Sequence, residues 1–175
     1  MRENPYLCIA MRHILLSLLL LLAAMGASAQ GSEPESPGLE FVMPLRVTLG
    51  EVFSAGDTPR GRRTVVPITG GTFEGPRLRG TVLPGGADYQ LGSGARTELE
   101  AVYCIRTDDG VTIHVRNLGI AAPAYFMAAP RFETASEGPY GWLNDALFVC
   151  APQSDPAFRG VVLNVWRVVP PQMSK

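Results

Sequence analysis

Short apolar segments alternate with turns rich in Gly, Pro and Asp after Gly38, and the helical period is almost absent. Such short segments, so often bounded by turn dipeptides, predict an all-β fold, either a sandwich or a barrel. The predicted strands are residues 39–49, 63–68, 71–73, 77–83, 88–91, 97–107, 111–117, 130–133, 142–150 and 161–169. Pro44 inside the first strand suggests an edge or a bulge. Residues 121–129 (AAPAYFMAA) predict a helical turn that Pro123 keeps short.

The clearest predicted element is a hairpin over residues 97–117, because Gly110 can supply the positive φ of its Asp-Asp-Gly turn. Pairing residue 107 with residue 111 places Cys104 opposite His114. One face of this hairpin is then mainly apolar, and we expect it in the core with the other face in water. The apolar face carries Leu99, Ala101, Tyr103, Ile105, Ile113 and Val115. The second face carries Glu100, Val102, Cys104, Arg106, Thr112, His114 and Arg116.

The most apolar stretch is at the N-terminus and has the three parts of a cleaved signal peptide. Met11-Arg12-His13 is positive, residues 14–25 are apolar apart from Ser17, and Ala27-Ser28-Ala29 forms a cleavage site. The apolar run is shorter than the ~20 residues of a spanning helix, so an uncleaved anchor is the weaker alternative.

These features predict a division of the chain into four parts and an exported mature protein, periplasmic or secreted by a bacterium. Residues 1–29 are the signal peptide, with Met11 as an alternative start, and residues 30–38 (QGSEPESPG) are a disordered tether. One β domain covers residues 39–169, and residues 170–175 form a C-terminal tail. No membrane span is expected once the signal is removed.

Two cysteines, Cys104 and Cys150, remain after cleavage, and an oxidising compartment permits a disulfide between them. The alternative is two separate free thiols. A disulfide would bring the polar hairpin face into one space with the Trp142- and Asn144-bearing face of residues 142–150. The polar row would then line a ligand cavity with aromatic walls; with the cysteines apart, it is surface.

Composition excludes several classes of protein. The net charge of −1 argues against a basic nucleic-acid binder. The content of 46% apolar residues argues against a disordered chain, and nineteen glycines with fifteen prolines argue against a long-helix protein. His114 is the only histidine after residue 29, no cluster has metal-ligand spacing, and no cofactor fingerprint is present. We therefore expect no metal, no cofactor and no nucleic-acid partner, and we make no prediction of oligomeric state.

Two carboxylates, Glu74 and Asp88, adjoin Gly-rich turns at strand ends, and binding groups concentrate on such loops. They are the candidate catalytic residues, although each polar residue alone is more often a solvated surface group. The candidate ligand-binding residues are Asp88, Arg106, His114, Arg116, Trp142 and Asn144.

Several motifs together resemble the domain-of-unknown-function family three-two-three-seven, also called uncharacterised protein family zero-three-one-one. They are residues 67–88 (PITGGTFEGPRLRGTVLPGGAD), 106–110 (RTDDG), 115–117 (VRN) with Gly119, 130–134 (PRFET) and 142–144 (WLN). The resemblance spans about residues 39–169 and implies a small antiparallel β-barrel, similar to lipocalin-like calycins, with an interior cavity and no settled reaction. The signal peptide, the two cysteines and a short 120–129 connection depart from the family pattern.

Three functions fit this description. The first is an exported barrel that binds a small, partly apolar organic molecule in its lumen. The second is a cofactor-independent lyase or isomerase that uses Asp88 or Glu74 as base, with Arg106 or Arg116 stabilising negative charge. The third is an envelope interaction protein with a solid barrel, because small barrels are either filled by side chains or hold one ligand.

Overall fold

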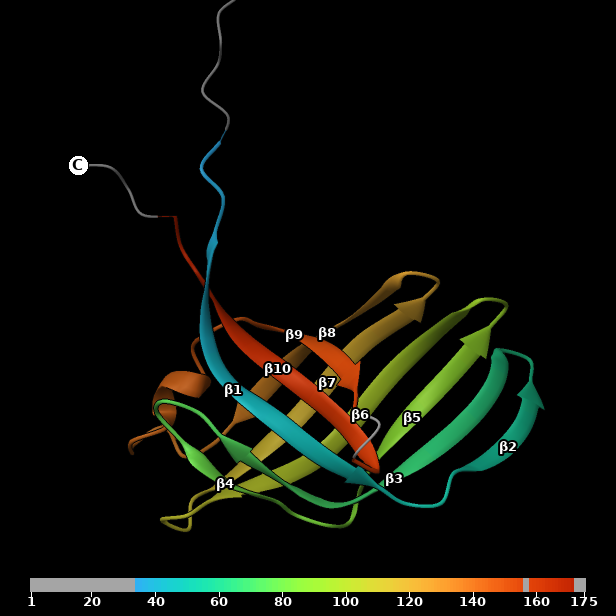
Figure 1. The fold of residues 1–175 in the computed structure, drawn as a ribbon, viewed down its shortest axis with the longest axis horizontal. Helices are drawn as coiled ribbons and strands as arrows, with labels where there is room; N and C mark the ends of the chain where they lie inside the picture. The colour runs from blue at the N-terminus through green and yellow to red at the C-terminus, as the bar shows by residue number, and fades with distance from the viewer. Residues whose placement is uncertain (1–33, 156–157, 172–175) are drawn as a thin grey trace, which may run out of the picture. The chain divides into compact units, whose positions relative to one another are not determined.

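The computed structural model describes residues 34–155 and 158–171. Two compact units divide the chain, residues 1–35 and 36–175, and the strands of the described residues lie in the second (Figure 1). The predicted signal peptide and the tether up to residue 33 lie outside the described residues, as do residues 172–175 of the predicted tail. No helix in the described ranges is long and apolar enough to cross a membrane.

The described part of the second unit contains ten strands and one 3-10 helix. They are β1 (Gly38–Leu49), β2 (Phe53–Thr58), β3 (Gly61–Glu74), β4 (Arg79–Val82), β5 (Gly86–Ser93), β6 (Arg96–Thr107), β7 (Thr112–Ala122), β8 (Tyr125–Glu133), η1 (Gly141–Leu143), β9 (Phe148–Ser154) and β10 (Gly160–Val169).

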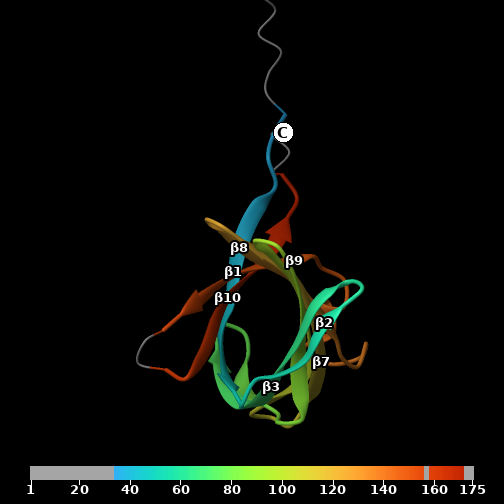
Figure 2. The same cartoon turned by 90° about the vertical axis from the view of Figure 1, so that its right-hand side faces the viewer.

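Eight of the strands close an antiparallel barrel in the order β1-β10-β9-β8-β7-β6-β5-β3, and β3 pairs back onto β1. Figure 2 shows the closed ring. Strand β4 bridges β3 and β6 beyond the end of β5, and β2 pairs with the first half of β3. The β8–β9 seam is the thinnest part of the wall, with one residue pair, Ala128 and Cys150. The predicted all-β barrel is confirmed.

Alternation along the strands decides which side chains point inward. In the hairpin of β6 and β7, Cys104 pairs with His114 and Ile105 with Ile113, as the sequence predicted. Ile105, Ile113 and Val115 are fully buried, so the apolar face is the inner one. A core of inward side chains packs one half of the barrel; its members include Met43, Leu45, Phe73, Val82, Ile105, Ile113, Val115, Phe132, Leu143, Phe148 and Val165.

The irregularity suggested by Pro44 is a bulge and not an edge. Strand β1 pairs with both β10 and β3, and its register with β10 shifts between Phe41 and Met43. Gly70-Gly71, predicted to separate two strands, instead lies within the continuous β3. Gly71 has φ +138, and a Cβ there would collide with the carbonyl oxygen of Arg46, so glycine permits the close crossing of β3 over β1.

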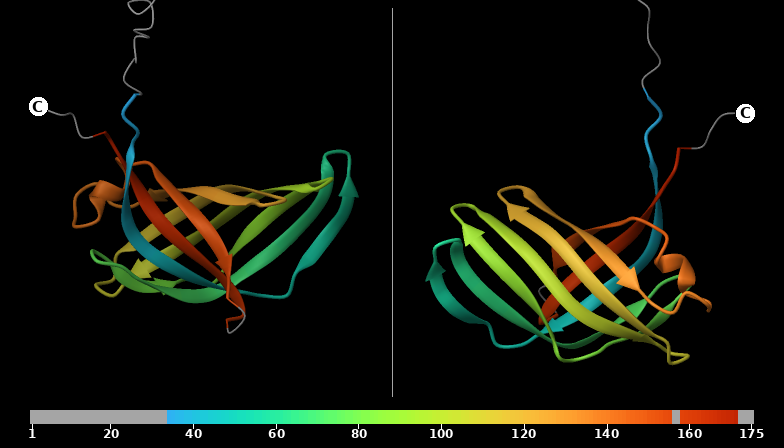
Figure 3. Two further views of the ribbon diagram at one scale, coloured as in Figure 1. Left: turned by 45° about the horizontal axis from the view of Figure 1, so that its top comes forward. Right: turned by 180° about the vertical axis from the view of Figure 1, so that it is seen from behind.

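Two other predicted elements are wrong. Residues 121–129 are not a helical turn: β7 and β8 form a hairpin whose tip has Ala124 at φ 59. Residues 142–150 are not one strand, because η1 occupies their start and β9 begins only at Phe148. The Arg77 guanidinium carbon lies over the Trp142 ring, 4.0 Å from the ring centroid. This contact holds η1 against the end of the barrel that the core fills, called the packed end below. Figure 3 shows these elements from two sides.

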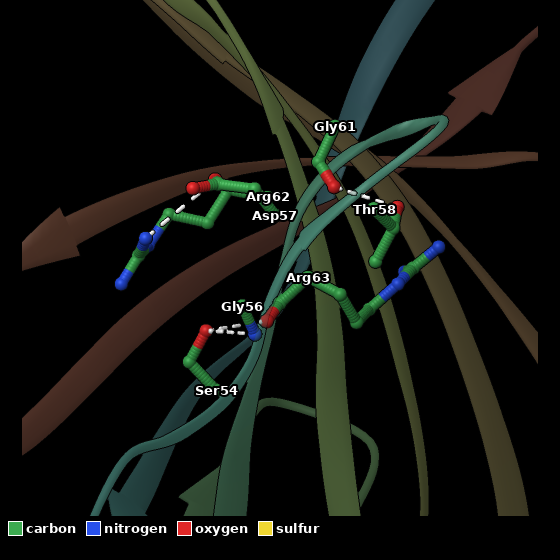
Figure 4. A network of polar contacts seen from close by, with 7 residues as sticks. All are labelled: Ser54, Gly56, Asp57, Thr58, Gly61, Arg62 and Arg63. Carbon is green, nitrogen blue, oxygen red and sulfur yellow. Dashed lines mark hydrogen bonds and ion pairs between the residues drawn. The ribbon is translucent and has the colours of Figure 1, made fainter.

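Strand β2 was not predicted, because its sequence FSAGDT lacks apolar alternation. Side-chain hydrogen bonds hold it instead (Figure 4): Thr58 Oγ1 donates to the Gly61 carbonyl oxygen at 2.7 Å, and Ser54 Oγ donates to that of Arg63 at 2.7 Å. An exposed ion pair joins Arg62 to Asp57 at 3.6 Å. The hairpin extends β3, which carries two cavity residues.

Candidate functional site

A cavity of about 250 Å³ occupies the half of the barrel that the core does not fill. Apolar side chains from β1, β3, β6, β8 and β10 form most of its wall, and the predicted interior cavity is therefore present. The lining residues are Val47, Leu49, Val66, Ile68, Asp88, Gln90, Leu99, Ala101, Tyr103, Asn117, Gly119, Phe126, Ala128, Pro152, Ser154, Gly160, Val161 and Leu163. Among the described lining residues, one carries an ionisable carboxyl group and none is Lys, Arg or His.

Asp88 projects into this cavity from β5, where it pairs with Val66 on one side and Ala101 on the other. Gln90 Nε2 donates a hydrogen bond of 2.7 Å to Asp88 Oδ2, whereas Oδ1 is buried without a hydrogen-bond partner among the described residues. Burial raises the pKa of Asp88, and hydrogen bonds from the Gln90 side chain and the Glu100 backbone partly oppose this rise. The result is a carboxyl group that can accept or donate a proton inside an apolar space.

Tyr103 lies on the inner face of β6, two residues beyond Ala101, and lines the same cavity. Its side chain is 4% exposed, and its hydroxyl has no hydrogen-bond partner among the described residues. Burial, followed by the nearby Cys150 and Asp88, raises the pKa of Tyr103, so the phenol stays protonated. Gly86 makes room for this residue, because a Cβ at position 86 would collide with Tyr103 Cβ.

Asn117 and Cys150 lie beside Tyr103, where the cavity meets the packed core. Asn117 Nδ2 lies 3.7 Å from Cys150 Sγ, and both side chains are buried. Burial raises the pKa of the Cys150 thiol to about 11. The thiol therefore remains protonated at neutral pH and is a poor nucleophile.

The predicted polar row does not line the cavity. Arg116 makes an ion pair with Glu100 at 2.7 Å, and Arg106 Nε donates to Thr112 Oγ1 at 3.4 Å on the outer face. His114, on the same face, has Nδ1 4.0 Å from Glu133 Oε2. The alternation of β6 and β7 explains this correction: with Ile105 and Ile113 inward, their neighbours must point outward.

The predicted disulfide is also absent: Cys104 and Cys150 are both free. Cys104 belongs to the outward row of β6, whereas Cys150 is fully buried on the inner side of β9. The alternative of two separate free thiols therefore holds, and the polar row is surface, as expected for cysteines that lie apart.

The other predicted site residues lie away from the lumen. Glu74 is exposed at the end of β3, paired with Arg79 of β4. Trp142 and Asn144 belong to the packed end, where Asn144 Oδ1 accepts a 3.0 Å hydrogen bond from the Thr134 backbone. Of the predicted residues, only Asp88 reaches the cavity.

Sequence reasoning missed Gln90, Tyr103 and Asn117 as cavity residues. Alternation predicts that Tyr103 lies on the apolar face within the core. The side chain does point inward, but its hydroxyl borders the cavity without a hydrogen-bond partner among the described residues. The available signal was the phenol of Tyr103 and the amide of Asn117 on the inward face of the hairpin. Such groups need hydrogen-bond partners when buried, so their presence there indicates a polar site. In the described ranges, no three His, Cys, Asp or Glu side chains are grouped as a metal site.

Residues 37–124 match the family model described as "Protein of unknown function (DUF3237)". A UPF0311 protein of Rhodopseudomonas palustris is 38% identical over 135 residues, which cover 65% of this chain and 88% of that protein. The crystal structure of a conserved protein of unknown function from the same organism superposes with a TM-score of 0.70 at 35% identity, covering 77% and 99% of the two chains.

A fungal relative carries a functional name. The hydroalkoxylation enzyme phnH of Penicillium herquei is 35% identical over 127 residues, covering 73% of this chain and 82% of that enzyme. The crystal structure of an enzyme from Penicillium herquei superposes with a TM-score of 0.65 at 30% identity, covering 79% of this chain and 98% of that one. The matched family model and the UPF0311 relatives agree with the motifs quoted above, and the chain belongs to the DUF3237 family of small β-barrel proteins.

Proposed function

We propose that the barrel binds a small, partly apolar organic molecule in its lumen. There, Asp88 catalyses addition of a hydroxyl group across a carbon–carbon double bond, or the reverse elimination, without a cofactor. The observation that carries this proposal is the Asp88 carboxyl group: Gln90 Nε2 donates to Oδ2, and Oδ1 faces an apolar cavity with no hydrogen-bond partner among the described residues. The name of the Penicillium herquei relative supports the same reaction class.

The chemistry needs one group that moves a proton. Asp88 Oδ1 takes the proton of the substrate hydroxyl while the hydroxyl oxygen of the substrate bonds to one alkene carbon. The same carboxyl group then returns the proton to the other alkene carbon. When hydroxyl and alkene belong to one molecule, the product is an isomer of the substrate and no other reactant is consumed. The raised pKa of Asp88 suits this exchange, because an acid–base group works best when its pKa approaches the working pH.

Electrostatics restrict the substrate. The part of the cavity lining that the structure describes has no basic side chain, so an anionic substrate would be desolvated without a counter-charge beside the Asp88 carboxylate. A neutral molecule avoids this cost. The apolar wall then contributes affinity through burial of the hydrocarbon part.

A lumen-filling variant tests whether the reaction takes place inside the barrel. A chalcone with a hydroxyl ortho to its carbonyl is a suitable probe, because its cyclisation to a flavanone is an internal addition that absorbance can follow. Ala101→Phe places a ring in the cavity and is expected to abolish binding and turnover. Val102→Phe, on the outer face of the same strand, is the matched control and is expected to retain both.

Each outcome of this test decides part of the proposal. Wild-type turnover by Ala101→Phe would exclude the lumen as the reaction site. Binding of the chalcone without cyclisation by the wild-type barrel would support ligand binding and overturn catalysis. Thermal melting of both variants checks that the barrel is folded.

We also propose that the protein is exported, on the basis of the charged, apolar and Ala27-Ser28-Ala29 segments at the N-terminus. Expression in a Gram-negative host is expected to give a periplasmic protein whose first residue is Gln30, as read by N-terminal sequencing. Replacing Ala27 and Ala29 by Phe should block this cleavage. A cytoplasmic product that keeps residues 11–29 would contradict export.

A further inference from the structure

We propose that Tyr103 is a second catalytic residue, and that the substrate is a neutral hydroxy compound whose double bond is conjugated to a carbonyl group. In this arrangement the Tyr103 hydroxyl donates a hydrogen bond to the carbonyl oxygen, while Asp88 Oδ1 receives the proton of the substrate hydroxyl. This inference rests on the proposed function, since it assigns the substrate class and a second role to the same cavity.

The unpartnered Tyr103 hydroxyl is the first observation. The side chain is almost fully buried and lines the cavity, yet no described residue accepts a hydrogen bond from its hydroxyl. A buried polar group without a hydrogen-bond partner destabilises the folded state. A bound molecule with an acceptor oxygen at this position would remove that destabilisation.

The second observation is that Asp88 and Tyr103 belong to one wall. Asp88 pairs across β5 and β6 with Ala101, and Tyr103 is the next inward residue of β6. The backbone around Tyr103 is closely packed, because Gly86 of β5 lies against it with no space for a side chain. Two rigid strands thus hold both unpartnered groups on the same face, as a precise site requires.

The Tyr103 hydroxyl and the Asp88 carboxylate need different hydrogen-bond partners. A phenol kept protonated by burial and by neighbouring Asp88 and Cys150 needs an acceptor, whereas an ionised carboxylate accepts only. A molecule with one hydroxyl donor and one carbonyl acceptor satisfies both. An isolated alkene would leave the Tyr103 hydroxyl unpaired.

The bond changes balance with these two residues alone. The substrate O–H bond breaks, its proton moves to Asp88, and its oxygen bonds to the alkene carbon distant from the carbonyl. The π electrons shift toward the carbonyl oxygen and give an enolate, which the Tyr103 hydroxyl stabilises. Asp88 then returns the proton to the carbon beside the carbonyl, and the product is an isomer of the substrate.

Kinetics of Tyr103→Phe with the ortho-hydroxy chalcone test the assignment. Loss of one hydrogen bond to a developing oxyanion is expected to lower kcat by about 10²-fold with little change in KM. Tyr89→Phe is the matched control, because Tyr89 is an exposed tyrosine on β5 next to Asp88 and outside the lumen; its kcat should equal that of the wild type. An unchanged kcat in Tyr103→Phe would overturn the catalytic role.

Infrared spectroscopy supplies a measurement that does not depend on turnover. Cyclohexenone labelled with carbon-13 at its carbonyl has no hydroxyl to add and can only bind. Its carbonyl stretch should lie at lower frequency in the wild type, Asp88→Asn and Tyr89→Phe than in Tyr103→Phe. Equal frequencies in all four proteins would overturn the hydrogen bond from Tyr103. Absence of chalcone turnover with the shift present would instead refute the proposed reaction and leave Tyr103 as a binding residue.

Discussion

Asp88→Asn is expected to lose about two to four orders of magnitude in turnover, the range typical for removal of a positioned acid–base group, and to melt above the wild type at neutral pH. The amide can still accept the hydrogen bond from Gln90 but cannot take up the substrate proton. The loss should fall on kcat, because the cavity keeps its shape. Asp57→Asn, an exposed change of the same charge on β2, should alter neither quantity.

The stability gain has a definite pH dependence. The pKa of Asp88 is raised in the folded state above its ordinary value of 3.8, so the folded protein holds this proton more tightly than the unfolded chain. Folding stability contributed by this group is fully present below that value and is lost as pH rises through the folded pKa. The melting temperatures of wild type and Asp88→Asn should therefore converge in acid and separate toward neutral pH. A gap that widens in acid would contradict the raised pKa.

Ile105→Ala is expected to reduce the free energy of unfolding by about 2–5 kcal/mol, as is usual for a fully buried aliphatic side chain. Ile105 is 0% exposed in the packed half of the barrel. At about 2–4 °C per kcal/mol for a domain near this size, the melting temperature falls by roughly 10 °C. Urea unfolding should show a lower midpoint with an unchanged slope.

Leu99→Ala is the matched control on the same strand and the same inward face. Leu99 is half-buried and already borders the cavity, so its truncation opens no new void in close-packed surroundings and should cost less stability than Ile105→Ala. Equal losses in the two variants would show that the two halves of the barrel are packed alike.

The sequence predicts which face of a strand a side chain points from, but not whether that side chain meets the packed core or the open cavity. The Asp-Asp-Gly turn predicts the hairpin register that pairs Cys104 with His114, and alternation predicts that Tyr103 lies on the inner face; the structure confirms both. Whether an inward residue meets packed core or open cavity depends on long-range pairing, such as that of Met43 with Val165, which no local pattern encodes. Asp88 was found because it follows a Gly-rich turn, whereas Tyr103 was hidden among apolar neighbours.

The errors have local causes. Residues 121–129 are mostly small, so their period is ambiguous between helix and strand, and the pairing of β7 with β8 decides it. Residues 142–150 are mostly apolar, which favours a strand, but the chain turns after Gly138, at φ 150, and enters η1 instead. The hypothesis that a disulfide turned the polar row inward failed because it required Ile105 and Ile113 to face water.

The split between a packed half and a hollow half has a consequence for how such a barrel evolves. Substitutions around Ile105 threaten the fold itself, whereas those around Leu99 and Ala101 change mainly the shape offered to a ligand. The cavity lining can therefore change in sequence while the packed half preserves the scaffold. A family with this architecture can vary its cavity without first acquiring extra stability to tolerate the change.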